Sequence, residues 1–301
     1  MIQTASQAKP SNSEFGLSSQ EYCDLCGNEK KGRHYSSATN HDILQCPSCR
    51  LLWTSPLLRG KPVYAGEETY VSNEIPQKVR FRKQLRLFME KTGHTQPESL
   101  RVLEIGSGLG YFLDVCEEAG IKAEGCDIAA EAIAYANRTR SRVREGTLDS
   151  YYPSESFDAI FAFNLIEHLP HPALFLREAY RALKPNGTLV LETPTQDSLF
   201  HRLGRVGDIC SRGKFALYGM APSGHIYKFS KKTFGHLAKS EFDILYAKNV
   251  ASPWSEIWGN SSSITLENRG LYRFSLPIVY LVAEMTGQEN RMLVMLRKRG
   301  N

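Results

Sequence analysis

Apolar residues recur along the chain in two periods, and these predict strands and helices in turn. Apolar runs of strand length predict buried strands over residues 101–105, 122–127, 143–148, 156–163, 188–194, 242–250 and 291–299. Apolar residues at helical spacing predict helices over residues 76–93, 128–140, 173–183 and 231–240, with one more after Gly110. Strands that alternate with helices are typical of an α/β fold built around a parallel sheet.

Two stretches bear on where the protein works. The first 20 residues are polar and lack the apolar core of a signal peptide, so residues 1–20 are expected to be a disordered tail. The longest apolar stretch near the end, residues 276–285, is far short of the roughly 20 residues that span a bilayer. A soluble, cytoplasmic protein without a membrane partner is therefore expected.

The composition is ordinary for a globular protein. Of its 301 residues, 42% are hydrophobic and 23% are charged, and the length suits one large domain plus a small one. The formal net charge of +5 is modest. It overstates the basic character if four cysteines bind zinc, because Zn²⁺ with four thiolates carries about two negative charges. Nucleic acid is therefore an unlikely partner on the charge alone.

Four of the seven cysteines form two Cys-x-x-Cys pairs, Cys23 with Cys26 and Cys46 with Cys49, separated by 19 residues. Two such turns supply the four tetrahedral thiolates that Zn²⁺ prefers, and this spacing predicts a zinc ribbon. A closed four-thiolate shell has no open position for water, so the metal is expected to stabilise the fold and not to catalyse. Free buried cysteines or a redox pair are the alternatives.

Three glycines, Gly106, Gly108 and Gly110, follow the strand at 101–105 directly. They allow backbone amides at the start of the next helix to approach a ligand closely. Asp127 ends the next strand about 20 residues later, the spacing at which a carboxylate binds ribose hydroxyls. A dinucleotide is disfavoured, because the third glycine of Gly-x-Gly-x-x-Gly would fall on Tyr111. An adenosine cofactor is indicated, and a glycine-rich turn in an unrelated α/β fold is the alternative.

With Glu104 on the strand itself, Glu-x-Gly-x-Gly-x-Gly resembles motif I of class I S-adenosylmethionine (SAM)-dependent methyltransferases. The segment Asn-Leu-Ile-Glu-His-Leu at 164–169 resembles the fourth-strand motif of the same superfamily, and Lys-Pro-x-Gly at 184–187 resembles the turn before its fifth strand. With the cysteine pairs, the chain is similar to the zinc-ribbon group that acts in sugar and secondary-metabolite pathways. The resemblance implies a Rossmann-like α/β fold: a seven-stranded, mostly parallel sheet with its last strand reversed, helices on both faces and a small N-terminal zinc ribbon.

This resemblance also implies a domain organisation. Residues 21–58 would form the zinc ribbon, and residues 59–98 a connector that ends in a lid helix. Residues 99–301 would form the SAM-binding methyltransferase domain, with an insertion at 195–230 that recognises the acceptor. An insertion of this length without regular structure is usually functional.

The resemblance implies a set of cofactor-binding residues around the glycine turn and the ends of the following strands. These candidates are Tyr70, Glu104, Gly106, Ser107, Gly108, Gly110, Tyr111, Phe112, Asp127, Ile128, Thr147, Leu148, Asn164, Leu165 and His168. Thr147 departs from the acidic residue that usually meets the adenine amine. The backbone amide of Leu148 is the alternative for that contact.

Three residues are candidates for catalysis: His225, Tyr227 and His168. His225 lies in a His-x-x-x-Phe-Ser segment that resembles one in the zinc-ribbon group, just before a helix whose expected N-cap is Ser230. Its reference pKa of about 6.5 suits a general base, although it could instead only position the loop. Tyr227 is the lesser candidate, and His168 either transfers a proton or organises its loop.

The function that these observations favour is SAM-dependent methyl transfer to a carbon, oxygen or nitrogen atom of a small molecule. An RNA methyltransferase, aminocarboxypropyl transfer, SAM cyclisation and a silent domain kept for protein interaction are the alternatives, because a fold fixes the cofactor and not the atom attacked. The acceptor and the oligomeric state are not indicated by the sequence.

Overall fold

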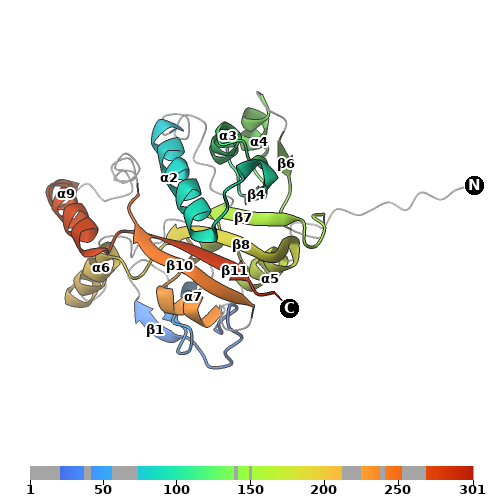
Figure 1. Ribbon diagram of the computed structural model, residues 1–301. Coiled ribbons are helices and arrows are strands. Elements are labelled where there is room, and N and C mark those ends of the chain that lie inside the picture. Colours follow the sequence, from blue (N-terminus) through green and yellow to red (C-terminus); the bar gives the residue numbers. More distant parts are fainter. Residues whose placement is uncertain are drawn as a thin grey trace, which may run out of the picture.

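The computed structural model describes residues 21–36, 42–55, 74–138, 142–148, 151–211, 225–237, 241–252 and 269–300. A seven-stranded sheet lies at its centre, in the order β10-β11-β8-β7-β4-β5-β6 (Figure 1). The strands from β8 to β6 pair in parallel, whereas β11 is antiparallel to both β8 and β10. The predicted α/β fold with a mostly parallel sheet and a reversed last strand is confirmed.

The elements of this domain follow the predicted alternation. The strands are β4 (Arg101–Ile105), β5 (Lys122–Asp127), β6 (Val143–Glu145), β7 (Phe157–Phe163), β8 (Leu183–Pro194), β10 (Phe242–Val250) and β11 (Arg291–Lys298). The helices are α2 (Glu74–Thr92), α3 (Tyr111–Glu118), α4 (Ala130–Ala136), α5 (Pro172–Ala182), α6 (Leu199–Cys210), α7 (Lys231–Leu237) and α9 (Arg269–Thr286), with 3-10 turns η1 (Pro97–Ser99) and η2 (Ile166–His168).

Strand β8 begins earlier than predicted and contains the expected turn. The register with β7 jumps from Phe157↔Leu183 to Ala159↔Thr188, so extra residues of β8 bulge out of the ladder. Within the bulge, the backbone of Asn186 has a positive φ of 63°. The Pro-Asn-Gly sequence therefore makes its tight turn inside the strand.

Side chains of the central strands alternate between two hydrophobic cores. Along β7, Ile160 and Ala162 belong to one core, and Ala159, Phe161 and Phe163 belong to the other. Helices α2, α3 and α4 cover the second core, whereas α5, α7 and the cysteine-rich region cover the first (Figure 1). Helices thus lie on both faces, as expected for a parallel sheet that is apolar on both sides.

The cysteine-rich region forms a second sheet, and the last strand of this sheet comes from a segment about 170 residues later in the chain. Its strands β1 (Arg33–Ser36), β2 (Asp42–Gln45) and β3 (Leu52–Ser55) are antiparallel neighbours. A fourth strand, β9 (Tyr227–Lys228), pairs with β3. Since β9 belongs to the segment 195–230, the ribbon and the insertion share one sheet, which the sequence did not predict.

The insertion also contains a helix where a long loop was expected. Ser198 caps α6, because its hydroxyl accepts a hydrogen bond from the amide of His201 at 3.1 Å. Apolar residues of α6 and α9, Phe200 with Leu276 and Ala283, form a small core between the two helices. At the end of the insertion, the amide of Thr233 donates to Ser230 at 3.1 Å, which confirms the predicted N-cap of α7.

Within the described ranges, none of the helices is both long enough and apolar enough to cross a bilayer.

Candidate cofactor and acceptor site

The glycine-rich turn between β4 and α3 has backbone conformations that other residues rarely take. The φ angles of Gly106, Gly108 and Gly110 are 72°, 52° and 80°, all in the left-handed region. The amides of Gly106 and Ser107 donate to the carbonyl of Cys126 on β5, at 2.8 Å and 3.1 Å. The turn is thereby fixed at the carboxyl edge of the sheet, that is, the side on which the parallel strands have their carboxyl ends. Open parallel sheets bind ligands on this side.

Asp127 at the end of β5 faces this turn. Its Oδ2 atom accepts a hydrogen bond from the amide of Gly108 at 2.8 Å, and its Oδ1 atom accepts one from the amide of Ala129 at 2.8 Å. Each carboxylate oxygen has about two acceptor positions, so both oxygens can accept a further donor. Asp127 therefore orders the turn and can also bind the two hydroxyls of a ribose.

The turn also depends on a glycine that the sequence analysis did not single out. A Cβ atom on Gly125 would lie 2.8 Å from the side chain of Ser107 and 3.0 Å from that of Leu113. Those distances are too short for ordinary packing. The requirement arises from a contact between β5 and the turn, and no local motif indicates it.

Glu104 on β4 is 3% exposed, and its Oε2 atom has no hydrogen-bond partner among the described residues. Burial raises the pKa of Glu104 well above its usual range, the neighbouring Asp127 raises it further, and Arg80 opposes the shift. An unpaired buried carboxyl oxygen costs about 1–3 kcal/mol, and a cationic ligand group would offset that cost. The residues at this edge therefore fit the ammonium group of SAM.

The fourth-strand motif meets the glycine turn at the same edge. Asn164, which follows β7, has a positive φ of 51°, a conformation that asparagine tolerates better than most residues. Its amide donates to the carbonyl of Glu192 at 2.8 Å, and its Oδ1 atom is buried without a partner in the described part of the chain. Leu165 lies against the turn, since a Cβ on Gly106 would come within 3.2 Å of it.

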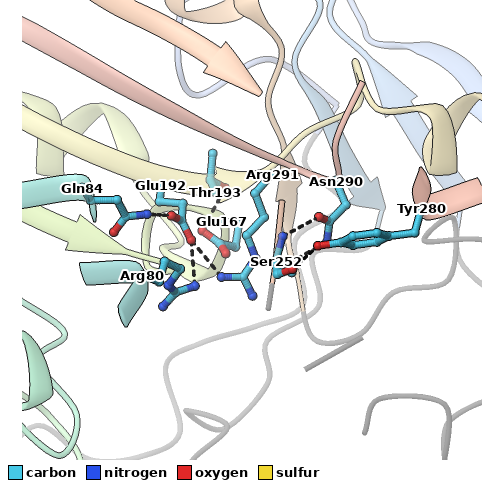
Figure 2. A network of polar contacts seen from close by, with 9 residues as sticks. All are labelled: Arg80, Gln84, Glu167, Glu192, Thr193, Ser252, Tyr280, Asn290 and Arg291. Carbon is cyan, nitrogen blue, oxygen red and sulfur yellow. Dashed lines mark hydrogen bonds and ion pairs between the residues drawn. The ribbon is translucent and has the colours of Figure 1, made fainter. Parts of the chain in front are cut away.

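A buried carboxylate on β8 joins three elements at this edge (Figure 2). Glu192 is completely buried, and its Oε1 atom accepts from Arg80 of α2 at 2.9 Å and from Arg291 of β11 at 2.8 Å. Gln84 of α2 donates to its Oε2 atom. These bonds hold α2, the expected lid helix, against the sheet close to the end of β8. Neither Glu192 nor Arg80 belongs to a recognisable motif, so sequence reasoning missed both.

Three side chains with proton-transfer chemistry gather beside Asn164. One polar side-chain atom of each of Glu167, His168 and His225 lies within 4.8 Å of the other two, and the centroids of the two imidazole rings are 4.8 Å apart at an interplanar angle of 61°. Glu167 is fully buried; its Oε2 atom accepts from Thr193 at 2.9 Å, whereas Oε1 has no partner among the residues described. The structure thus brings two of the predicted catalytic residues together and adds Glu167, which the fourth-strand motif contains.

The electrostatics of this cluster keep His225 neutral. Burial, together with the nearby His168, Lys228 and Arg291, lowers the pKa of His225 to about 3. Burial also raises the pKa of Glu167 to about 7. Near neutral pH the His225 imidazole is therefore uncharged, and one of its two ring nitrogens is an acceptor.

The remaining predicted residues lie in different surroundings. Phe112 is fully buried against Phe161 and Phe163, and Tyr111 is 5% exposed in the same core. Tyr227 is 1% exposed, and its hydroxyl donates to the carbonyl of Pro170 at 3.1 Å.

Of the candidates near the adenine, Leu148 is buried, whereas Thr147 and Ile128 are exposed. Tyr70 lies outside the described residues.

The four paired cysteines converge as predicted. The sulfur atoms of Cys23 and Cys49 are 3.6 Å apart, as are those of Cys26 and Cys46, and all four lie within 4.8 Å of one another. Tetrahedral Zn–S bonds of about 2.3 Å would place the sulfurs about 3.8 Å apart, so the group fits Zn²⁺. The contact between the two sulfur atoms lowers the pKa of Cys23 to about 6 and raises the pKa of Cys49 well above its usual range.

Residues 77–242, about half of the chain, match the family model described as a methyltransferase domain. A Mycolicibacterium smegmatis protein named as a probable S-adenosylmethionine-dependent methyltransferase is 34% identical over 32% of this chain and 38% of its own length. A ubiquinone biosynthesis O-methyltransferase of Bradyrhizobium diazoefficiens is 31% identical over 36% of this chain and 45% of its own. The chain thus spans less than half the length of these two relatives.

Among solved structures, one chain of a complex containing the Haloferax volcanii Trm112 methyltransferase activator is similar in fold. Its TM-score is 0.53 at 13% identity, and the match covers 78% of this chain and 96% of that one.

Proposed function

The chain belongs to the family of methyltransferase domains, and from this premise we propose that it transfers the methyl group of SAM to a small-molecule acceptor. The proposal rests on one juxtaposition. The cluster of Glu167, His168 and His225 lies directly beyond Asn164, at the sheet edge that carries the glycine turn and Asp127. A candidate cofactor-binding turn and a candidate proton acceptor therefore share one edge, as methyl transfer to a protonated acceptor requires.

SAM supplies an electrophilic methyl group on a sulfonium, which is a good leaving group. In this proposal Asp127 binds the ribose hydroxyls, and the buried Glu104 binds the ammonium end. The left-handed turn at Gly106–Gly110 lets the backbone lie close to the ligand. The protein then needs only to hold the acceptor in line behind the methyl group and to take up its proton.

We assign the proton-accepting step to His225. The low pKa keeps this ring neutral near pH 7 but also makes it a weak base, so uptake of the acceptor proton as the new bond to the methyl group forms depends on stabilisation of the imidazolium. His168 lies against the same ring, and the Glu167 carboxyl is placed to stabilise the resulting imidazolium. Tyr227 has a positioning role here, because its hydroxyl is already donated to Pro170.

A small acceptor is favoured over RNA for two reasons. The two relatives named above include a ubiquinone biosynthesis O-methyltransferase, whose name indicates a small hydroxylated acceptor. The formal net charge of +5 is also modest for a protein that binds RNA.

The experiment is a cofactor-binding and product assay on the full chain. Calorimetry with SAM should show saturable binding, and incubation with a panel of phenols, catechols, sugars and amines should yield S-adenosylhomocysteine with at least one of them. Methylthioadenosine as the product would replace methyl transfer by another SAM reaction. Absence of SAM binding would remove the proposal altogether.

A further inference from the structure

We propose that the zinc ribbon positions residues on the acceptor side of the site, which is the side formed by Glu167, His168 and His225. The metal-binding turn at Cys46–Cys49, the second zinc knuckle, holds the strand that presents His225 to Glu167 and His168. This inference rests on the proposed function and deepens it, because it assigns the ribbon a role in acceptor chemistry that is separate from SAM binding. It follows from how β3 and β9 are joined.

The segment carrying His225 is an integral part of the ribbon sheet. Leu52 and Trp53 of β3 pair with Lys228 and Tyr227 of β9, and the amide of Thr54 donates to the carbonyl of Ile226 at 3.1 Å. His225 immediately precedes this pairing. Its backbone position is therefore tied directly to the ribbon, in addition to the bonds that this segment makes to the cofactor domain.

On its other side, the same segment is held by the loop of the fourth-strand motif at 164–170, called the motif loop below. The amide of Ile226 donates to the carbonyl of Glu167 at 2.8 Å, and Tyr227 donates to the carbonyl of Pro170. The strand thus lies between the ribbon and the loop that carries Glu167 and His168. Any displacement of the ribbon would move His225 relative to these two residues.

The link to the metal site is direct. The amide of Cys46 donates to the carbonyl of Leu51 at 2.9 Å, so the second zinc knuckle closes immediately before β3. Gln196 donates from Nε2 to the carbonyl of Arg50 in this knuckle at 2.9 Å and to the carbonyl of Lys228 at 3.2 Å. One amide side chain therefore bridges the knuckle and β9.

A second contact joins the ribbon to the helix of the insertion. The Ser36 hydroxyl donates to Oδ2 of Asp208 on α6 at 2.8 Å. The Tyr35 hydroxyl oxygen lies 3.1 Å from Nε2 of His201 on the same helix. Ser36, Asp208 and His201 are each 5% exposed or less. Buried polar contacts of this kind fix geometry more than they add stability. The ribbon consequently contacts both described segments of the insertion, through α6 in the first and β9 in the second.

The test combines two perturbations of the full chain. The first removes the metal with a chelator, and the loss is verified by metal analysis. The second is Gln196→Glu, which keeps the size of the side chain but removes both donated hydrogen bonds. Gln96→Glu is the matched control, because Gln96 is exposed and precedes β4, near the amino end of that strand.

Hydrogen exchange provides a readout that needs neither SAM nor acceptor. We expect chelation and Gln196→Glu to speed exchange of the Thr54 and Ile226 amides at least tenfold, while the Gly106 and Ser107 amides exchange as before. Gln96→Glu should change none of them. Unchanged exchange at Ile226 after metal loss would overturn the inference, and so would an equal loss of protection at Gly106, which would make the metal a requirement of the whole fold.

Activity separates this inference from the proposed function. Once an acceptor is known, Gln196→Glu should lower kcat about tenfold and alter its pH profile, with the Kd for SAM within twofold of the unmodified protein. A fall in SAM affinity equal to the fall in kcat would contradict a role limited to the acceptor side. If SAM fails to bind the unmodified protein, the proposed function is wrong, yet the exchange experiment still decides whether the ribbon positions β9.

Discussion

The cofactor side and the acceptor side of this site are built in different ways. The cofactor side is made by one continuous stretch, in which Glu104, the glycine turn and Asp127 are joined mainly through backbone amides. The acceptor side is assembled from distant segments, as shown by the bonds between Tyr227 and Pro170, 57 residues apart, and between Ser36 and Asp208, 172 residues apart. Local sequence determines the first, whereas tertiary pairing determines the second.

This difference predicts how each side responds to change. A backbone-built turn tolerates side-chain substitution except where a glycine or the capping carboxylate is essential. An assembled side depends on the relative placement of ribbon, motif loop and insertion, so remote changes should disturb catalysis without disturbing cofactor affinity. The predictions below either separate the two sides or show that they act as one.

The largest expected effect is on the acceptor side. His225→Ala removes the proposed proton acceptor and should lower kcat about 100-fold, the usual scale of general-base catalysis. The Kd for SAM should change less than twofold, because the cofactor contacts lie elsewhere. Steady-state kinetics and calorimetry on His225→Ala, with His236→Ala as the control, test this split. Normal turnover would reduce His225 to a packing residue.

The second effect is on the cofactor side. Asp127→Ala removes the ribose acceptor and also the bonds to Gly108 and Ala129, so the Kd for SAM should rise about 30-fold, equivalent to about 2 kcal/mol. The exposed Glu131→Ala on α4 is the matched control for loss of a carboxylate nearby. Calorimetry is the measurement. Unchanged affinity in Asp127→Ala would remove the ribose assignment and the basis for treating this stretch as the cofactor side.

The contrast between the two sides also explains what could be predicted from the sequence. Apolar periodicity gave the order of the strands and helices, and the spacing of Gly106 to Asp127 gave the position of the turn, because these depend on neighbours in the chain. The convergence of the four cysteines was predicted for the same reason: each pair is local, and a tetrahedral metal ion would need both pairs as ligands. His168 and His225 were identified individually as candidates.

The remainder depends on contacts that no local pattern encodes. Nothing in the sequence around Tyr227 indicates that it pairs with Trp53, because two-residue strands have no detectable period. Glu192 lies within an apolar strand, and its partners Arg80 and Arg291 come from α2 and β11. Buried ion networks of this kind become visible only when the sheet order is known.

The third prediction tests whether the cofactor side is as local as it appears. In Gly125→Ala the new methyl group would lie 2.8 Å from Ser107, whose amide is bonded to the adjacent Cys126, so the turn cannot yield freely. Overpacking of this kind should lower the free energy of unfolding by about 1–3 kcal/mol. Gly235→Ala in α7 is the control: nothing lies within 4 Å of its new Cβ, and the substitution favours a helix. Equal unfolding midpoints in urea for the two variants would contradict the tight contact.

The smallest effect concerns the contact between the ribbon and α6, and it is a pH dependence. Burial, together with the cations Lys228 and Arg205, lowers the pKa of His201 to about 3, and the Tyr35 hydroxyl hydrogen-bonds to Nε2 of its ring. The unfolded chain, with a histidine pKa of about 6.5, therefore binds more protons between pH 6.5 and 3. Stability should fall as the pH decreases through that window.

His201→Gln can still hydrogen-bond to Tyr35 but cannot be protonated. Below pH 6.5, the free energy of unfolding of this variant should therefore fall less steeply with decreasing pH, by a slope that corresponds to at most one proton. The measurement is the free energy of unfolding in urea at intervals from pH 7 to pH 4 for both proteins. Taking the difference between them removes the contributions of His225 and Glu167, which are shared. Parallel curves would mean that His201 is accessible to protons in the folded state, and the acceptor side would then be less firmly closed against the ribbon than these contacts imply.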